Sequence, residues 1–351
     1  MIGVVRLGWM RLPAGAPRRR GARGLAWAAL VLLPLAVIAA GPPAFTESDH
    51  AYLAATPPVV ETLERSAPPA VDAASVLVLD ANTGRIVWGI KPHLRWYPAS
   101  TVKMMTALLA AQSGQLDRQI DFVPAMGADG SSAGLLPGDR LTMRDLLRAM
   151  LVPSGNEAAN AIAYALGDGS IARFVAQMNE QAARWGLRDT RFVNPHGLDA
   201  PGEHTSAFDL ATLALRLLAD PLLAQIVATP RLDMRVGTRT LVLKSTNDLL
   251  VQGVPGVDGV KTGTEDLARE NQVTSVTRDD HRVMIVVLGS NDRDPASLGL
   301  IDWAFSAFRW RDLGDGKPPV MLPAWLVPFE APAEVLRAAA ASRAGDEVPL
   351  P

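Results

Sequence analysis

The feature that most constrains this chain is the stretch Met104–Leu109, in which almost every residue is apolar or small, directly after Ser100 and Lys103. A helix that is apolar on every side is buried inside a protein, so this stretch predicts a core helix that begins after Pro98. Ser100 and Lys103 are three residues apart and therefore share one face of that helix. Because burying an ammonium group costs a large free energy, the pair calls for a functional explanation.

A serine and a lysine on one buried face can form a base-assisted nucleophile. A serine hydroxyl ionises far above neutral pH and attacks only when a base removes its proton. A lysine that burial keeps neutral can serve as that base. The spacing Ser-x-x-Lys is a weak signal when it stands alone. The chain is poor in lysine, however, and contains only Lys91, Lys103, Lys244, Lys261 and Lys317.

The composition is that of an ordinary globular protein of one or two domains, with 351 residues, 48% of them hydrophobic and 20% charged. A formal net charge of -2 offers no basic surface for nucleic acid. There is no cysteine, which excludes disulfides and thiolate chemistry and fits either redox compartment. We expect no cofactor.

Residues 1–41 have the layout of an export segment. A basic stretch that contains residues 18–20 and Arg23, all arginine, precedes the apolar run Leu25–Ala40. The run is short for a membrane span, and the residues leave open a cleaved signal peptide or an uncleaved anchor in the cytoplasmic membrane. Either way, the positive charges stay in the cytoplasm and the remaining chain lies outside it, in the periplasm or cell envelope.

Three further segments follow the export segment. Residues 42–72 are rich in Pro, Ala and Thr and are predicted to be a linker. Residues 73–311 have the patterns of a folded domain. Residues 312–351 form a Pro- and Ala-rich tail that is too short for another domain, and the sequence assigns it no function.

Strand patterns open and close the folded domain, with helical patterns between them. The predicted strands are Ser75–Asp80, Arg85–Trp88, Gly256–Gly263, Gln272–Thr277 and Arg282–Leu288. After the core helix, the predicted helices are Met143–Met150, Phe174–Trp185, Ser206–Leu218 with Ser206 as N-cap, and Leu298–Phe308. Segregated runs of this kind predict an α+β fold, with an antiparallel sheet and a separate helical cluster. The active site would lie at the seam between them.

Two other clusters accompany the serine–lysine pair. Ser154-Gly155-Asn156 lies between apolar helical stretches, and Lys261-Thr262-Gly263 lies on a predicted strand. The order Ser-x-x-Lys, Ser-x-Asn, Lys-Thr-Gly is the signature of class A β-lactamases and penicillin-binding proteins. With these motifs the chain resembles the D-alanyl-D-alanine carboxypeptidases, the low-molecular-weight penicillin-binding serine peptidases, over roughly residues 73–310.

Two flanking segments strengthen this resemblance. Asp80–Gly84 is similar to the family's turn before the nucleophile, and Phe192–Leu198 is similar to its Phe-x-Asn-x-x-Gly-Leu segment. The resemblance implies a β-lactamase-like fold with residues 73–311 as the catalytic domain. It also implies peptidoglycan pentapeptide stems as substrates and β-lactam antibiotics as covalent inhibitors.

The resemblance further implies roles in acylation. Ser100 would attack the carbonyl of the penultimate D-alanine to form an acyl-enzyme, and Lys103 would take its proton. Ser154 would relay the proton to the leaving amine, and Asn156 would hold the substrate amide.

By the same resemblance, the Lys-Thr-Gly strand would bind the end of the substrate. Lys261 and Thr262 would bind its terminal carboxylate, while Gly263 would let the peptide backbone approach the strand edge. The backbone N–H groups of Ser100 and Thr264 would form the oxyanion hole.

Two residues depart from the family pattern, which has a threonine and a glycine where this chain has Glu265 and Arg269. If the strand continues, Glu265 faces the same side as Lys261. Its charge would then oppose carboxylate binding and raise the pKa of Lys103. We expect Arg269 to offset this by pairing with Glu265.

Three alternative hypotheses remain. A serine β-lactamase would need a Glu-x-x-Leu-Asn segment between Ser154 and Lys261, and the sequence contains none there. A non-catalytic penicillin-sensing or wall-binding homologue is favoured only by the two departures. Metal binding or a Ser-His-Asp triad is suggested by His196, Asp199, Glu203 and His204, but their spacing fits no helix-borne pair of ligands, so we expect no metal.

Overall fold

The computed structural model describes residues 60–62 and 67–310. The chain divides into two units, residues 1–46 and 47–351, and all described residues belong to the second. The predicted export segment, the tail 312–351 and most of the linker 42–72 lie outside the described residues.

A five-stranded antiparallel sheet with the strand order β3-β2-β10-β9-β8 forms the centre of the domain. Its strands are β2 (Ser75–Asp80), β3 (Arg85–Ile90), β8 (Val257–Glu265), β9 (Arg269–Arg278) and β10 (His281–Ser290). Pairing of β10 with β2 brings together the early and late strands of the chain. Both predicted groups of strands are confirmed, and β8 is an edge strand of this sheet.

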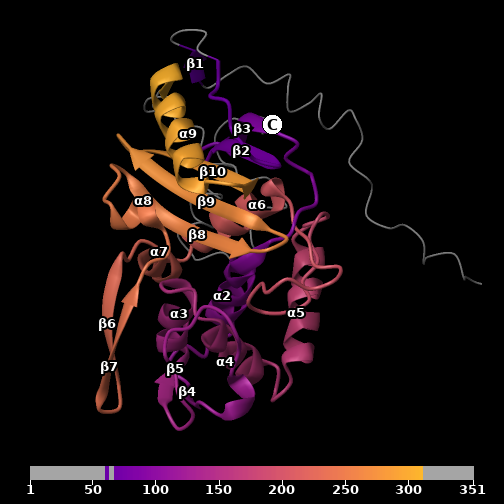
Figure 1. Cartoon of the computed structure of the whole chain (residues 1–351), viewed down its shortest axis with the longest axis vertical. Coiled ribbons are helices and arrows are strands. Elements are labelled where there is room, and N and C mark those ends of the chain that lie inside the picture. Colours follow the sequence, from indigo (N-terminus) through magenta and orange to yellow (C-terminus); the bar gives the residue numbers. More distant parts are fainter. Residues whose placement is uncertain (1–59, 63–66, 311–351) are drawn as a thin grey trace, which may run out of the picture. The chain divides into compact units, whose positions relative to one another are not determined.

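The alternation of side chains along β2 divides the core in two. Val76 and Val78 pack in one cluster with α9 (Arg293–Ala307), whereas Leu77 and Leu79 belong to a larger cluster formed by the other helices. Successive side chains of a strand point to opposite faces, so the sheet is covered on both sides (Figure 1). This explains why β2 is apolar at almost every position.

The larger cluster holds most of the remaining helices. They are the 3-10 turn η1 (Ala99–Val102), α2 (Lys103–Gln112), α3 (Met143–Leu151), α4 (Asn156–Leu166), α5 (Ile171–Arg184), α6 (Ala207–Leu218) and α7 (Pro221–Val227). The short helix α8 (Asp248–Val251) instead contributes Leu249 to the smaller cluster with α9. Ser206 caps α6 by accepting from Asp209 N, as predicted. Among the described helices none alone has the length and hydropathy of a membrane span, and the pair α6 and α7 that reaches it together is bent by 111°.

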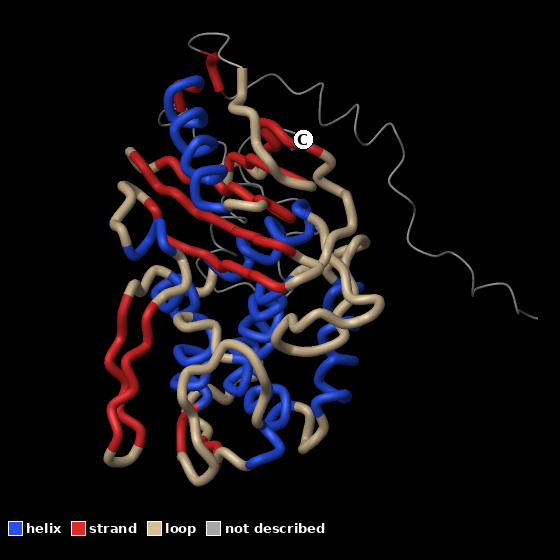
Figure 2. Tube along the Cα trace, in the orientation of Figure 1, coloured by secondary structure: helices blue, strands red, loops and turns tan. Residues whose placement is uncertain are grey.

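Several short elements were not predicted from the sequence. They are η2 (Pro124–Met126) and the paired strands β1 (Val60–Thr62) with β11 (Phe308–Trp310), β4 (Gln119–Asp121) with β5 (Arg140–Thr142), and β6 (Arg231–Val236) with β7 (Arg239–Lys244). The β6–β7 hairpin is the long red pair of strands below the sheet in Figure 2. The predicted α+β class is confirmed.

Candidate active site

The nucleophile candidate lies in a strained turn directly before the core helix. Ser100 belongs to η1, and Lys103 is the first residue of α2. In a 3-10 turn, residues three apart lie directly above one another, and Lys103 Nζ is 2.7 Å from Ser100 Oγ. Ala99, just before the serine, has a φ of 48°, a left-handed conformation that is unfavourable for alanine.

Lys103 is fully buried, with 0% of its surface exposed. Its Nζ also donates to the backbone carbonyl of His196 at 2.6 Å. Burial, and next the positive charge of Lys261, hold the pKa of Lys103 well below its usual value. The two hydrogen bonds hold the amine against the serine hydroxyl, and the lowered pKa favours the neutral form that a general base requires.

The turn is held from the sheet side by Asn271 on β9, which the sequence did not single out. Its side-chain amide donates to the carbonyls of Tyr97 and Pro98, and its Oδ1 accepts from Gly289 N. Each hydrogen-bonding group of this buried side chain is thereby used. The backbone before Ser100 is tied to two strands.

Two glycines allow other segments to touch this turn. A Cβ at Gly197, whose φ is 93°, would lie 1.8 Å from the Ala99 carbonyl oxygen. A Cβ at Gly263 would lie 2.9 Å from Ala99 Cβ and 3.0 Å from Ser100 N. The Lys-Thr-Gly strand therefore passes against the nucleophile, as the family resemblance implied, and only glycine fits there.

Ser154 lies in the turn between α3 and α4, and Asn156 is the first residue of α4; both helices pack against α2. Ser154 has a φ of 66°. Both residues are buried, yet among the described residues neither Ser154 Oγ nor Asn156 Oδ1 has a hydrogen-bond partner. Asn156 Nδ2 donates to the carbonyl of Asp129. Buried polar atoms are normally paired, so these two oxygens have unused capacity for a ligand.

Glu157 supports the loop beside this turn. Its Oε1 accepts from Ser132 Oγ and from the backbone N–H groups of Ala133, Gly134 and Leu135. That loop also supplies the carbonyl of Ser131, which accepts from Asn156 N. Through Oε1 the carboxylate fixes this loop as a wall of the site.

Lys261 is buried, and its Nζ donates to the Thr262 carbonyl at 2.8 Å. Burial, followed by the charge of Arg293, lowers its pKa to about 7. Arg293, from the first turn of α9, also donates to the Gly263 carbonyl at 3.3 Å and to the Thr264 hydroxyl. Arg293 was not predicted, because it is distant along the chain and belongs to no motif.

The expected ion pair between Glu265 and Arg269 is wrong. The two residues face each other across the β8–β9 hairpin by register. However, the Arg269 guanidinium donates to the Gly289 carbonyl and to Asn291 Oδ1. The backbone of Arg269 is left-handed, with a φ of 58°, and its side chain leaves the hairpin toward Gly289 and Asn291. The Glu265 charge does raise the pKa of Lys103, although less strongly than burial and Lys261 lower it.

The histidine and acidic side chains that suggested a metal site, between His196 and His204, belong to a loop that supports Lys103. Glu203 accepts from the backbone N–H groups of Val193 and Asn194, so it holds the loop that presents the His196 carbonyl to Lys103. Burial raises the pKa of Glu203 to about 7 and lowers that of His196 to about 4. Among residues 60–62 and 67–310, no group of three or more such side chains is arranged to hold a metal ion.

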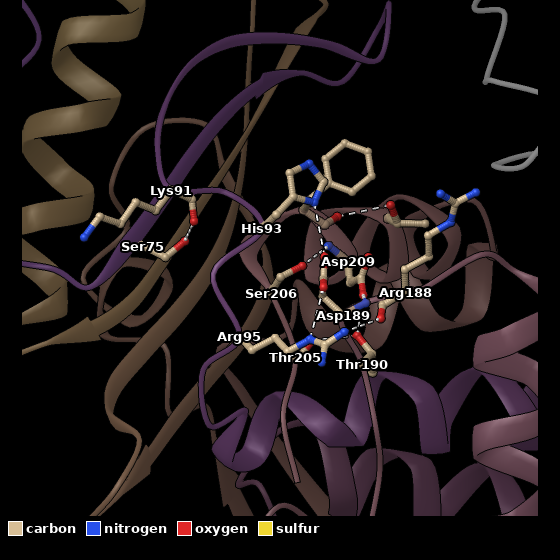
Figure 3. A network of polar contacts seen from close by, with 12 residues as sticks. Ser75, Lys91, His93, Arg95, Arg188, Asp189, Thr190, Thr205, Ser206 and Asp209 are labelled. Carbon is tan, nitrogen blue, oxygen red and sulfur yellow. Dashed lines mark hydrogen bonds and ion pairs between the residues drawn. The ribbon is translucent and has the colours of Figure 1, made fainter. Parts of the chain in front are cut away.

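A second polar network holds the segment that leads into the nucleophile turn (Figure 3). Asp189 accepts from Arg95 Nε at 3.2 Å and lies 3.3 Å from His93 Nδ1. Asp209 on α6 accepts from Asp189 N and from Thr190 Oγ1, and burial raises its pKa to about 7. This network connects residues before Ser100 to α6.

The geometry defines a class of protein. A buried serine–lysine pair at the seam between an antiparallel sheet and a helical cluster is the arrangement of a penicillin-binding serine hydrolase. Comparison with known proteins gives the family. Residues 62–292 match the D-alanyl-D-alanine carboxypeptidase family, and the chain belongs to it.

The relatives agree with this assignment. The D-alanyl-D-alanine carboxypeptidase DacF of Bacillus subtilis is 31% identical over 261 residues, which cover 71% of this chain and 66% of that protein. The D-alanyl-D-alanine carboxypeptidase DacB2 of Mycobacterium tuberculosis is 32% identical, with 67% and 82% covered. Penicillin binding protein 5 of Haemophilus influenzae superposes with a TM-score of 0.64 at 30% identity, with 69% and 73% covered.

Proposed function

We propose that this protein is a serine-type D-alanyl-D-alanine carboxypeptidase, which removes the terminal D-alanine from peptidoglycan stem peptides through an acyl-enzyme on Ser100. The observation that carries the proposal is the 2.7 Å contact between Ser100 Oγ and the buried Lys103 Nζ. A buried lysine of lowered pKa is a base only if it is adjacent to a proton that must leave, and here the adjacent proton belongs to a hydroxyl. No cofactor takes part in this chemistry.

Acylation begins when Lys103 takes the Ser100 proton and Ser100 Oγ attacks the penultimate carbonyl. The N–H groups of Ser100 and Thr264 stabilise the oxyanion. The Ser154 hydroxyl relays the proton from Lys103 to the leaving D-alanine amine. The lack of a hydrogen-bond partner for Ser154 Oγ among the described residues supports this role, since the hydroxyl can bond a substrate group. Water then releases the acyl group.

Substrate recognition uses both walls of the cleft. The Asn156 carbonyl oxygen, also unpaired among the described residues, accepts the substrate amide N–H. Lys261, Thr262 and the nearby Arg293 bind the terminal carboxylate. Gly263 lets the peptide lie against the edge of β8.

Carboxylate binding and base catalysis support each other. The pKa of Lys261 is about 7. When the terminal carboxylate of the substrate binds, its negative charge favours the charged form of Lys261. A charged Lys261 in turn keeps the pKa of Lys103 low, because the two cations repel. The substrate therefore helps to keep Lys103 neutral at the moment when a base is needed.

The proposed setting is outside the cytoplasm, where peptidoglycan stems are found. Residues 1–41 would export the domain, either as a cleaved signal or as an anchor in the cytoplasmic membrane. β-Lactams would act as covalent inhibitors by acylating Ser100. Protease added to intact spheroplasts should digest the domain, and full protection would contradict this location.

The function is tested with a fluorescent penicillin and a D-alanine release assay on a D-alanyl-D-alanine peptide. We expect stable labelling and release by the parent chain, and loss of both, by at least about 10⁴-fold, in Ser100→Ala. An unchanged thermal unfolding midpoint controls for folding, since the change removes only one hydroxyl. Rapid turnover of the penicillin would instead indicate a β-lactamase, and labelling without release would indicate a penicillin-sensing homologue.

A further inference from the structure

Glu265 lies on the side of β8 that faces the nucleophile. Lys261, Gly263 and Glu265 alternate along the strand and so share one face. That face is fixed by Gly263, because a Cβ there would meet Ser100 N at 3.0 Å. The electrostatic influence of Glu265 on the pKa of Lys103 agrees with this orientation.

The Glu265 carboxylate has no partner of its own. Within residues 60–62 and 67–310 it forms no hydrogen bond and no ion pair, and its side chain is partly exposed. Arg269, its neighbour across the hairpin, is directed to Gly289 and Asn291. A carboxylate that faces a substrate cleft with no internal cation can bind a cation from outside.

The hairpin holds Glu265 in place. The backbone N–H of Leu267 donates to Asp199 Oδ2 at 2.8 Å, and Trp96 Nε1 donates to the Ala268 carbonyl at 2.8 Å. Ala268 itself is fully buried. The turn that follows Glu265 is thus anchored on both sides, which limits the motion of the carboxylate.

The proposed function gives the direction of the substrate along β8. The terminal carboxylate lies toward Lys261 and Thr262, and the scissile carbonyl lies at Ser100, beside Gly263. Residues on the amino side of the scissile bond must then continue toward Glu265. A strand advances by about 3.3 Å per residue, so Glu265 lies about 7 Å beyond Gly263. An extended peptide also advances by about 3.3 Å per residue, so the residue before the penultimate D-alanine begins about halfway to Glu265, and a long side chain on it spans the remaining distance.

We propose that Glu265 is a specificity-determining residue that binds a free amine on the side chain of the stem residue directly before D-alanyl-D-alanine. This inference rests on the proposed function and names its substrate class, stems with an unmodified diamino acid at that position. It also gives a reason for the departure from the family's threonine. The negative charge of Glu265 weakens carboxylate binding at Lys261, but it adds an ion pair with the side-chain amine of the substrate.

The test compares two peptides that differ only at one amine. These are Nα-acetyl-L-Lys-D-Ala-D-Ala and its Nα,Nε-diacetyl counterpart. For the parent chain we expect a higher kcat/KM on the free-amine peptide. Glu265→Gln should lower the ratio of the two kcat/KM values about fivefold, at the upper end for a partly exposed ion pair. Added salt should lower the parent's ratio in the same direction.

Asp266→Asn is the matched control, because it removes the same charge one residue further on, at an exposed position. It should leave the ratio within about twofold of the parent. If Glu265→Gln unfolds, Glu265→Thr, which restores the family residue, replaces it. An unchanged ratio in the Glu265 variant, or an equal loss in Asp266→Asn, overturns the inference while leaving the proposed function intact. Release from neither peptide by the parent chain overturns the proposed function itself.

Discussion

Two groups of buried ionisable side chains in this domain make an instructive comparison. Lys103 and Lys261 belong to the cleft, whereas Glu203 and Asp209 belong to the supporting network. Burial is the main cause of the pKa shift in all four, lowering it for the lysines and raising it for the acids. A shifted pKa therefore does not by itself separate a reactive group from a structural one.

What separates the two groups is the use of hydrogen-bonding capacity around them. The oxygens of Glu203 and Asp209 accept from backbone and hydroxyl donors that belong to the fold. In the cleft, Ser154 Oγ and Asn156 Oδ1 have no partner among the described residues. Buried lysines next to polar groups without hydrogen-bond partners therefore indicate a ligand-binding site.

The strongest test of this comparison is Lys103→Met, which keeps the length of the side chain and removes the base. We expect the second-order rate of Ser100 acylation by a fluorescent penicillin at pH 7.5 to fall about 10³-fold, within the range for loss of a general base. Circular dichroism and the thermal unfolding midpoint check that the domain still folds. Acylation within tenfold of the parent would mean that Lys103 is a structural cation.

The second prediction concerns Lys261→Met. Loss of this cation should reduce kcat/KM on a D-alanyl-D-alanine peptide about 30-fold or more, as expected for a buried charged partner. It should also raise the pKa of Lys103, since Lys261 now lowers it. Because the base must be neutral, the rising limb of the kcat/KM profile should move to higher pH.

Arg269→Gln is the control for Lys261→Met. It also removes one positive charge, but its guanidinium is directed away from Glu265, toward Gly289 and Asn291. We expect a pH profile like that of the parent. A shift of the rising limb in Arg269→Gln equal to that in Lys261→Met would show that general charge, rather than the position of Lys261, controls the base.

Much of this arrangement could be predicted from local patterns. The apolar core helix, the alternating strands and the Ser206 cap depend on neighbouring residues, and each was found near its expected position. The family resemblance also implied that the Lys-Thr-Gly strand runs beside Ser100, and in the structure a Cβ at Gly263 would lie 3.0 Å from Ser100 N. Local periodicity carries this information because helices and strands bury one face at a fixed repeat.

The contacts that the sequence could not supply depend on long-range packing. Asn271 reaches Tyr97 and Pro98 only because β9 lies beside the nucleophile turn. Arg293 reaches the Lys-Thr-Gly strand only because α9 begins at its edge. The partner predicted for Arg269 was wrong because its backbone has a φ of 58°, which turns the side chain away from Glu265. A left-handed backbone is uncommon for arginine, and no residue pattern predicts it here.

The smallest expected effect on activity comes from the other group, in Asp209→Asn. The native pKa of Asp209 is about 7, whereas an unfolded aspartate ionises near pH 4. Between these values the native state keeps a proton that the unfolded state has released. Stability must therefore fall as pH rises through this window, by on the order of 4 kcal/mol from this group. Asparagine has no such proton, so the decline of the unfolding midpoint between pH 4.5 and 7 should be shallower.

The acylation rate of Asp209→Asn should stay within about twofold of the parent, because the carboxylate accepts from Asp189 N and Thr190 Oγ1 and from no residue assigned to the cleft. Asp117→Asn, whose side chain is 88% exposed, is the control and should retain the parent's pH dependence of stability. A parent-like slope in Asp209→Asn would show that this carboxyl is ionised in the folded protein. A large loss of acylation would show that the supporting network is part of the catalytic machinery, and the distinction between the two buried groups would then fail.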